Sequence, residues 1–237
     1  MVQRTPGFDT LAIHAGAQPD PATGARATPI YQTTSFVFDD VDHAASLFGL
    51  KAFGNIYTRI MNPTQAVLEE RIAALEGGTA ALATASGHAA QLLIFHTLMR
   101  PGDNFIAANK LYGGSINQFG HAFKNFGWEV RWADTDEPES FDGLIDDKTR
   151  AIFVESLANP GGKFVDLEKI GDIARKHGLP LIVDNTMASP YLLRPIEHGA
   201  DIVVHSLTKF MGGHGNSMGG AIVDGGTFNW SKSGNYP

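Results

Sequence analysis

Residues 181–209 read LIVDNTMASPYLLRPIEHGADIVVHSLTK, and this stretch decides the fold. It contains two short apolar runs, one ending at Asp184 and the other leading into Ser206, Thr208 and Lys209. Runs of this length are typical of buried strands, and parallel α/β sheets bind their ligands at the carboxyl ends of strands. The stretch therefore predicts two neighbouring strands that end in chemically active side chains.

Similar apolar runs recur through the rest of the chain. Helical patterns or Gly/Pro turns separate them, as at residues 167–177, and a further helix is predicted from Pro63, capped by Asn62, to Gly77-Gly78. Strands alternating with helices indicate a doubly wound α/β domain with a mostly parallel sheet covered on both faces. The predicted strands lie near residues 79–85, 104–108, 128–132, 150–155, 180–185, 201–206 and 219–223.

The first 60 residues have a different character. They are rich in Pro, Thr and Gly and show little periodicity, so we expect an N-terminal arm over 1–60 and a large domain over 61–237. The N-terminus lacks the apolar core of a signal peptide. Residues 82–99 are weakly polar but contain Ser, Gly, His and Gln, which favours a buried strand-turn-helix over a membrane helix.

Composition excludes several function classes. The chain has 237 residues, 43% hydrophobic and 18% charged, as expected of a globular protein with a substantial core. A net charge of -7 argues against a nucleic-acid partner. The absence of cysteine removes disulfides and thiolate metal sites and fits the cytoplasm. Nine histidines occur without a metal-binding spacing, so no metal is expected.

The polar residues at the strand ends match the requirements of one cofactor. Pyridoxal phosphate needs an amine for its aldehyde, a carboxylate for its ring nitrogen, and hydroxyls or amides for its phosphate. Lys209, Asp184 and the Ser206/Thr208 pair offer these groups. Taken alone, Lys209 is better explained as a surface lysine after a buried strand, and it is the neighbouring residues that favour the cofactor.

Two other motifs are compatible with the same cofactor. Gly87 and His88 open a predicted helix after Ser86, and amides at a helix N-terminus bind phosphate; an ordinary strand-to-helix turn explains them equally well. Tyr57 and Arg59 can form a phosphate-binding fork or a plain surface pair.

Two loop residues complete the candidates. Tyr112, flanked by glycines, can stack on a pyridine ring or simply face solvent. Asn159 can hydrogen-bond the phenolate oxygen of the cofactor, although Asn-Pro is also a common turn. Nucleotide binding is disfavoured, because the glycines of residues 213–219 miss the dinucleotide spacing and Gly162-Lys163 lacks the P-loop pattern.

Taken in this order, the residues resemble the Cys/Met-metabolism family of fold-type I pyridoxal-phosphate enzymes. The resemblance runs from about Thr28 to the end of the chain. It implies an aspartate-aminotransferase-like domain with a seven-stranded, mostly parallel sheet. The motifs that carry it are TPIYQTTSF (28–36), YTR (57–59), LYGG (111–114), VDNT (183–186) and HSLTK (205–209).

The resemblance implies roles for these residues. Lys209 would bind the cofactor covalently and shuttle protons, and Asp184 would pair with the ring nitrogen. Tyr112 would stack on the ring, and Asn159 would contact its phenolate oxygen. The phosphate would be held by Ser206, Thr208, the Gly87 and His88 amides and, from a neighbouring subunit, Tyr57 and Arg59. Many relatives carry methionine in place of His88, and a contact through its amide makes this difference unimportant.

The glycine-rich segment 212–220 and the tail 225–237 resemble the sulfhydrylase branch of the family. This implies γ-replacement, in which O-acetyl-L-homoserine and sulfide give L-homocysteine and acetate, in a cytoplasmic homotetramer. Cystathionine γ-synthase, O-succinylhomoserine sulfhydrylase and methionine γ-lyase are alternatives. Members continue into a smaller C-terminal domain with the arginine that binds the substrate carboxylate. That domain is expected to be absent from this chain, which leaves a non-catalytic, cofactor-binding fragment as a further alternative.

Overall fold

The computed structural model describes residues 6–234 and residue 236, and the chain divides into two compact units, Met1–Arg71 and Ile72–Pro237. Residues 1–5 of the expected arm and residues 235 and 237 of the tail lie outside the described part. The helix α3, Pro63–Glu76, begins in the first unit and ends in the second. It confirms the helix predicted there, and the side-chain Oδ1 of Asn62 accepts a hydrogen bond from Thr64 N–H at 2.9 Å, as a cap does.

The first unit contains two short helices, α1 (Phe8–His14) and α2 (Val41–Phe48), in a segment for which the sequence predicted little regular structure. The Asp40 carboxylate caps α2 by accepting a hydrogen bond from His43 N–H at 2.7 Å. A single antiparallel bridge joins Ser35 and Tyr57. The described residues between these helices and α3 form loops and turns, and α1 has no side-chain hydrogen bond at its N-cap.

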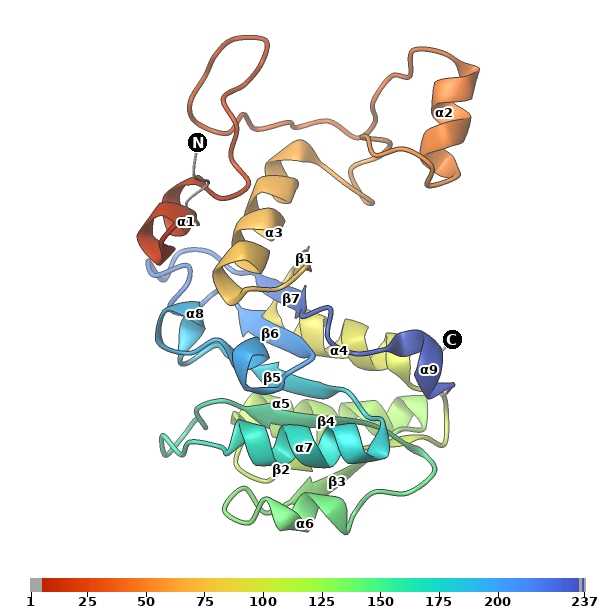
Figure 1. Ribbon diagram of the computed structural model, residues 1–237, viewed down its shortest axis with the longest axis vertical. Coiled ribbons are helices and arrows are strands. Elements are labelled where there is room, and N and C mark those ends of the chain that lie inside the picture. The colour runs from red at the N-terminus through yellow and green to blue at the C-terminus, as the bar shows by residue number, and fades with distance from the viewer. Residues whose placement is uncertain (1–5, 235, 237) are drawn as a thin grey trace. The chain divides into compact units, whose positions relative to one another are not determined.

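The second unit is built on one seven-stranded sheet (Figure 1). The strand order is β1-β7-β6-β5-β4-β2-β3; β7 is antiparallel to both neighbours, and the remaining pairs are parallel. All seven predicted strands are confirmed. They are β1 (Ala80–Thr84), β2 (Asn104–Ala108), β3 (Glu129–Ala133), β4 (Thr149–Glu155), β5 (Leu181–Asp184), β6 (Ile202–Ser206) and β7 (Gly220–Asp224).

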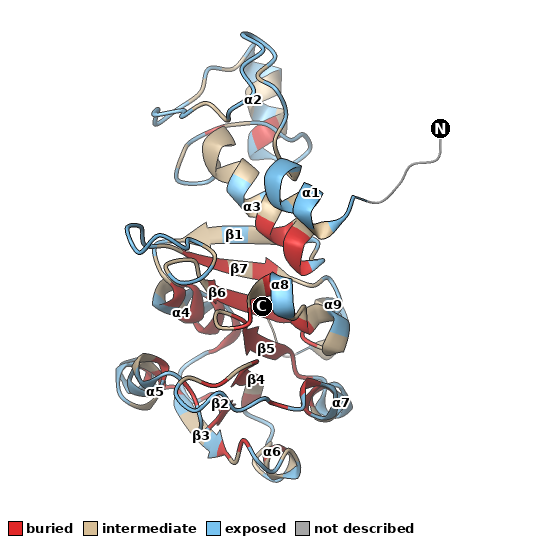
Figure 2. Cartoon of the chain, turned by 90° about the vertical axis from the view of Figure 1, so that its left-hand side faces the viewer, coloured by how far each residue is buried: buried red, intermediate tan, exposed pale blue. Residues whose placement is uncertain are grey.

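Helices cover both faces of this sheet, which confirms the doubly wound α/β prediction. Figure 2 shows α4 (Gly87–Leu98) and α5 (Gly113–Gly120) on one side and α7 (Leu167–His177) and α9 (Trp230–Ser233) on the other. Among the described residues, no helix is both long and apolar enough to span a membrane. Shorter helices complete the unit: η1 (Ala122–Phe126), α6 (Glu139–Asp142), α8 (Ser189–Leu192) and η2 (Pro195–His198).

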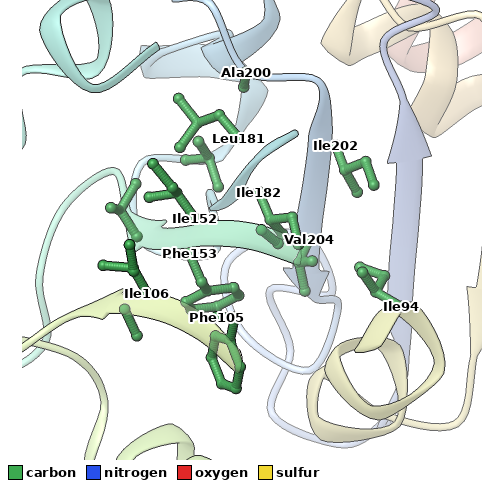
Figure 3. Packing of buried hydrophobic residues seen from close by; sticks show 14 of the residues in the cluster. Ile94, Phe105, Ile106, Ile152, Phe153, Leu181, Ile182, Ala200, Ile202 and Val204 are labelled. Carbon is green, nitrogen blue, oxygen red and sulfur yellow. The ribbon is translucent and has the colours of Figure 1, made fainter. Parts of the chain in front are cut away.

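The core lies between the central strands and their helices. Adjacent strands each contribute a fully buried side chain to it: Phe105 from β2, Ile152 from β4, Leu181 from β5 and Val204 from β6 (Figure 3). Phe95 of α4 packs on Phe105 with ring centroids 4.1 Å apart. Because the central strands are apolar on both faces, as parallel strands usually are, their polar residues are confined to the strand ends. The core thus fixes where those ends lie.

Candidate cofactor-binding site

A cavity of about 280 Å³ opens at the carboxyl edge of the sheet, where β4, β5 and β6 end and α4 and α5 begin. Eight of the ten predicted residues line it: Gly87, His88, Tyr112, Asn159, Asp184, Ser206, Thr208 and Lys209. The other two, Tyr57 and Arg59, are not among the described residues lining the cavity. They lie exposed in the first unit, with Arg59 Cζ 5.6 Å from the Tyr57 ring centroid.

The start of α4 forms one wall of this cavity. The Ser86 hydroxyl caps the helix by accepting a hydrogen bond from Ala89 N–H at 3.1 Å, which leaves the Gly87 and His88 N–H groups without an intrahelical acceptor. A Cβ on Gly87 would lie 3.0 Å from Ser206 Cβ, so glycine eases the close approach of the helix start to the end of β6. Within the described part of the chain these two amides have no hydrogen-bond partner, and they lie next to the hydroxyl-bearing Ser206.

Asp184 forms the floor of the cavity and is 9% exposed. One of its carboxylate oxygens accepts a hydrogen bond from Thr186 N–H at 3.0 Å, and the other a long one from Gln91 Nε2 at 3.4 Å. Gln91 Nε2 also donates to Ser115 Oγ at 3.0 Å. Gln91 and Ser115, which the sequence analysis missed, come from α4 and α5 and give no local motif that would reveal their contact.

Glu155 is a second carboxylate in the cavity and was not predicted as a site residue. It pairs with Asp184 across β4 and β5 and is 5% exposed. Its two oxygens accept hydrogen bonds from Tyr112 N–H at 2.7 Å and Asn159 N–H at 3.0 Å. Burial, with the nearby Asp184 charge, raises the pKa of Glu155 to about 7. Like Asp184, Glu155 is the last residue of an apolar strand, so the sequence signal that identified Asp184 could also have identified Glu155.

Tyr112 lies at the cavity mouth beside His88. Their rings stack with centroids 5.9 Å apart and planes at 28°. A Cβ on Gly114 would lie 2.4 Å from Tyr112 Cε1 and 2.8 Å from His88 Cε1, so glycine at this position lets the two rings approach α5. The His88 imidazole thus packs against the predicted stacking residue, a contact that the sequence did not predict.

The turn after β6 carries the remaining groups. Lys209 is exposed, and its backbone N–H donates to Ser206 O at 3.2 Å. Ser206 N–H donates to Thr186 Oγ1 at 2.8 Å, which ties the end of β6 to the segment after β5. The Thr208 hydroxyl already bonds Gly219, donating to its carbonyl at 3.3 Å and accepting from its N–H at 3.2 Å. Thr208 must therefore exchange a partner before it can donate to a ligand.

The groups of this cavity match those that pyridoxal phosphate requires. Lys209 supplies an exposed amine, Asp184 a buried carboxylate without a cationic partner among the described residues, and α4 two free amides beside Ser206. In addition, the buried Gln91 Oε1 has no hydrogen-bond partner within the described part of the chain. No group of three His, Asp or Glu residues there is arranged to hold a metal ion.

The comparisons with known proteins agree with this assignment of class. The family model of the Cys/Met metabolism PLP-dependent enzymes matches residues 9–236. The chain belongs to this family of pyridoxal-phosphate enzymes.

Individual relatives are described as sulfhydrylases. O-acetyl-L-homoserine sulfhydrylase from Leptospira meyeri is 55% identical over 94% of this chain and 51% of its own length. O-acetyl-L-homoserine sulfhydrylase 1 from Thermus thermophilus is 57% identical over 97% of this chain and 55% of its own length. The chain thus spans about half the length of the relatives it matches.

A solved structure shares the fold closely. It is a Campylobacter jejuni protein, provisionally assigned as an O-acetylhomoserine (thiol)-lyase, that contains a pyridoxyl-lysine phosphate. The TM-score is 0.94 and the identity 42%, over 98% of this chain and 58% of that one. The aspartate-aminotransferase-like, fold-type I prediction is confirmed.

Proposed function

We propose that the protein carrying this chain is an O-acetylhomoserine sulfhydrylase that converts O-acetyl-L-homoserine and sulfide into L-homocysteine and acetate, a step toward methionine. The observation that carries the proposal is the single cavity that brings together Lys209, Asp184 and the free amides of α4. Relatives that are 55–57% identical and described as O-acetyl-L-homoserine sulfhydrylases support the choice within the family.

Each cavity residue has a part in holding the cofactor. When bound, pyridoxal phosphate supplies an aldehyde that bonds to the lysine amine and a ring that withdraws electrons from the substrate α-carbon. Asp184 holds the proton on the ring nitrogen, and Ser206 with the Gly87 and His88 amides binds the phosphate. Thr208 joins this phosphate site if its hydroxyl turns away from Gly219.

Lys209 is the proton carrier of the proposed reaction. Once the substrate is bound, the Lys209 amine would remove the proton from the substrate α-carbon and return it as the product forms. Acetate leaves from the γ-carbon and sulfide takes its place, so the substrate exchanges a C–O bond for a C–S bond. Tyr112 stacks on the cofactor ring, and the Asn159 amide donates to its phenolate oxygen, while Glu155 holds the backbone of both residues.

The first unit has the chemistry of a segment that completes a neighbouring subunit. Several large apolar side chains are strongly exposed in it, including Ile30, Val37, Leu50 and Phe53. Surfaces of this kind usually mark interfaces. We assign residues 1–60 to an arm that brings Tyr57 and Arg59 to the phosphate of another subunit in a homotetramer. The lack of cysteine suits the reducing cytoplasm, where we place the reaction.

An activity assay tests the proposed reaction. The protein is supplied with O-acetyl-L-homoserine or O-succinyl-L-homoserine, each with and without sulfide, and homocysteine and α-ketobutyrate are measured. Homocysteine formed from the acetyl ester only with sulfide is the expected result. Preference for the succinyl ester, or α-ketobutyrate formed without sulfide, would replace the proposal with another γ-enzyme. Cofactor retention without turnover would indicate the non-catalytic fragment.

The shared site has a separate test. Arg59→Ala should release cofactor during dialysis although Arg59 lies in the first unit, whereas Lys51→Ala, another exposed cation of that unit, should not. Mixing Arg59→Ala with Lys209→Ala should restore some intact sites, each built from two chains. Equal cofactor retention in the Arg59 and Lys51 variants would count against the shared site.

A further inference from the structure

A second row of polar residues lies directly behind the cavity. Ser156, Asn185 and His205 are the chain neighbours of Glu155, Asp184 and Ser206, and none of the three lines the cavity. Ser156 is 1% exposed, and the other two are 0% exposed. Because successive side chains of a strand point to opposite faces, His205 of β6 lies on the opposite side of the sheet from Ser206. Hydrogen bonds connect His205 through Glu76 to Asn185 and Ser156, the first residues after β5 and β4.

Glu76, the last residue of α3, joins this row. It is 0% exposed, and its Oε1 accepts a hydrogen bond from Asn185 Nδ2 at 2.9 Å and bonds His205 Nε2 at 2.5 Å. Asn185 Nδ2 also donates to Leu193 O at 2.8 Å, and Asn185 Oδ1 accepts from Ser156 Oγ at 2.8 Å. One carboxylate oxygen thus connects the ends of β5 and β6, and Asn185 extends the connection to β4.

The energetics of this network do not favour it as a device for stability. Burying a carboxylate costs more than burying an apolar group unless all its lone pairs are satisfied. Among the described residues, Glu76 Oε2 and His205 Nδ1 are buried and have no hydrogen-bond partner. Well-packed apolar residues of the same size are often neutral or stabilising replacements for such a pair. What the polar pair provides in addition is a fixed distance and orientation between strands.

We propose that Glu76 is a positioning residue: through Asn185 and His205 it fixes the carboxyl ends of β5 and β6, and so aligns Asp184 and Ser206 with one cofactor molecule. The inference rests on the cofactor site of the proposed function. Glu76 itself touches no ligand. It acts through Asn185, the neighbour of Asp184, and through His205, the neighbour of Ser206.

The test compares two hydrogen-bond networks of the same sheet, one at each edge. Glu76→Gln keeps the size of the side chain but removes the charge that binds two donors. Asn104→Ala breaks a network at the amino ends of β2 and β4, where Asn104 bonds Asp146 at 2.8 Å and Thr149 at 2.8 Å. For each variant, the dissociation constant of pyridoxal phosphate is measured by visible absorbance and the urea midpoint by circular dichroism.

We expect Glu76→Gln to raise the dissociation constant about tenfold and to alter the pH dependence of the visible band, whereas Asn104→Ala lowers the urea midpoint alone. If Glu76→Gln does not fold, the double variant Glu76→Leu/His205→Phe tests the same positioning role. It should keep or raise the urea midpoint and still lose cofactor affinity. An unchanged dissociation constant in a folded Glu76 variant would overturn the positioning role. If the unaltered protein itself does not bind the cofactor, the proposed function fails. That outcome differs from failure of the positioning role alone, in which the unaltered protein and the variant bind equally well.

Discussion

Two acids, one at each edge of the sheet, have pKa values shifted in opposite directions. At the amino edge, Asp146 accepts a hydrogen bond from Asn104 and pairs with Arg131 at 2.8 Å, and these contacts hold its pKa well below the usual range. At the carboxyl edge, Glu155 and Asp184 lie side by side without a cationic partner among the described residues, and burial raises the pKa of Glu155 to about 7. Asp146 is paired within the chain, whereas Asp184 at the carboxyl edge keeps a carboxylate available for a ligand.

This difference predicts opposite responses to pH, the largest effect we expect. Folding raises the Glu155 pKa from 4.5 to about 7, so the folded protein binds more protons and its stability falls as the pH rises through this window. As the pH rises through this window, the unaltered protein should lose about 3 kcal/mol of unfolding free energy relative to Glu155→Gln, since each unit of pKa shift corresponds to about 1.4 kcal/mol. Urea unfolding of both proteins from pH 4.5 to 8 measures this change in the free energy of unfolding.

Asp146→Asn provides the opposite sign. Because folding lowers the Asp146 pKa below 3.8, its contribution is present above that pH and is lost as the pH falls. The stability advantage of the unaltered protein over Asp146→Asn should therefore shrink in acid, while its advantage over Glu155→Gln should grow. The same sign at both positions would contradict the contrast between the edges.

Removing one acid from each edge should separate binding from stability. Asp184→Ala should weaken pyridoxal phosphate tenfold to about a hundredfold, because hydrogen bonds to charged groups contribute about 1.5–3 kcal/mol. Asp146→Ala should leave the affinity within about twofold and lower the urea midpoint instead. Absorbance titration of both variants decides the matter; comparable affinity losses would mean that Asp184 has no specific role.

The glycines at the start of α5 offer a sharper test inside the carboxyl edge. A Cβ at Gly114 collides with the Tyr112 and His88 rings, whereas a Cβ at Gly113 meets nothing within 4 Å. Overpacking of this kind costs about 1–3 kcal/mol, so Gly114→Ala should lower cofactor affinity about tenfold and Gly113→Ala should not. Quenching of tyrosine fluorescence by added cofactor reports the same displacement. Equal affinities would show that the ring stack does not matter.

The smallest effect concerns single hydroxyls at the two ends of β6. Thr186→Val removes the acceptor of Ser206 N–H, a bond of about 0.5–1.5 kcal/mol, and should reduce cofactor affinity about threefold. Thr227→Val removes a donor to Asp201 at the amino end of the same strand and should affect stability only. If Thr227→Val reduced cofactor affinity as much as Thr186→Val, the distinction between the ends would fail.

The contrast also explains what the sequence could reveal. The seven strands were predictable because each is a short apolar run with polar ends, and β5 shows this most clearly at Asp184. Parallel strands bring such ends to one edge, which is why eight of the ten predicted residues line one cavity.

Contacts between distant segments were not predictable in this way. Glu76 looks like an ordinary helix-end acid before Gly77, and its burial depends on His205, 129 residues further along the chain. The stacking of His88 on Tyr112 depends on the missing side chain of Gly114, which no spacing rule indicates. The helices α1 and α2 are only seven and eight residues long, so periodicity gave little sign of them.

The central claim is that the carboxyl edge binds pyridoxal phosphate through Lys209, and trapping the covalent bond tests it most directly. The protein is mixed with the cofactor, reduced with borohydride, digested, and the modified peptide is located by mass. We predict a stable pyridoxyl adduct on Lys209 that is absent from Lys209→Ala. An adduct on another lysine, or no adduct in the presence of excess cofactor, would contradict the account.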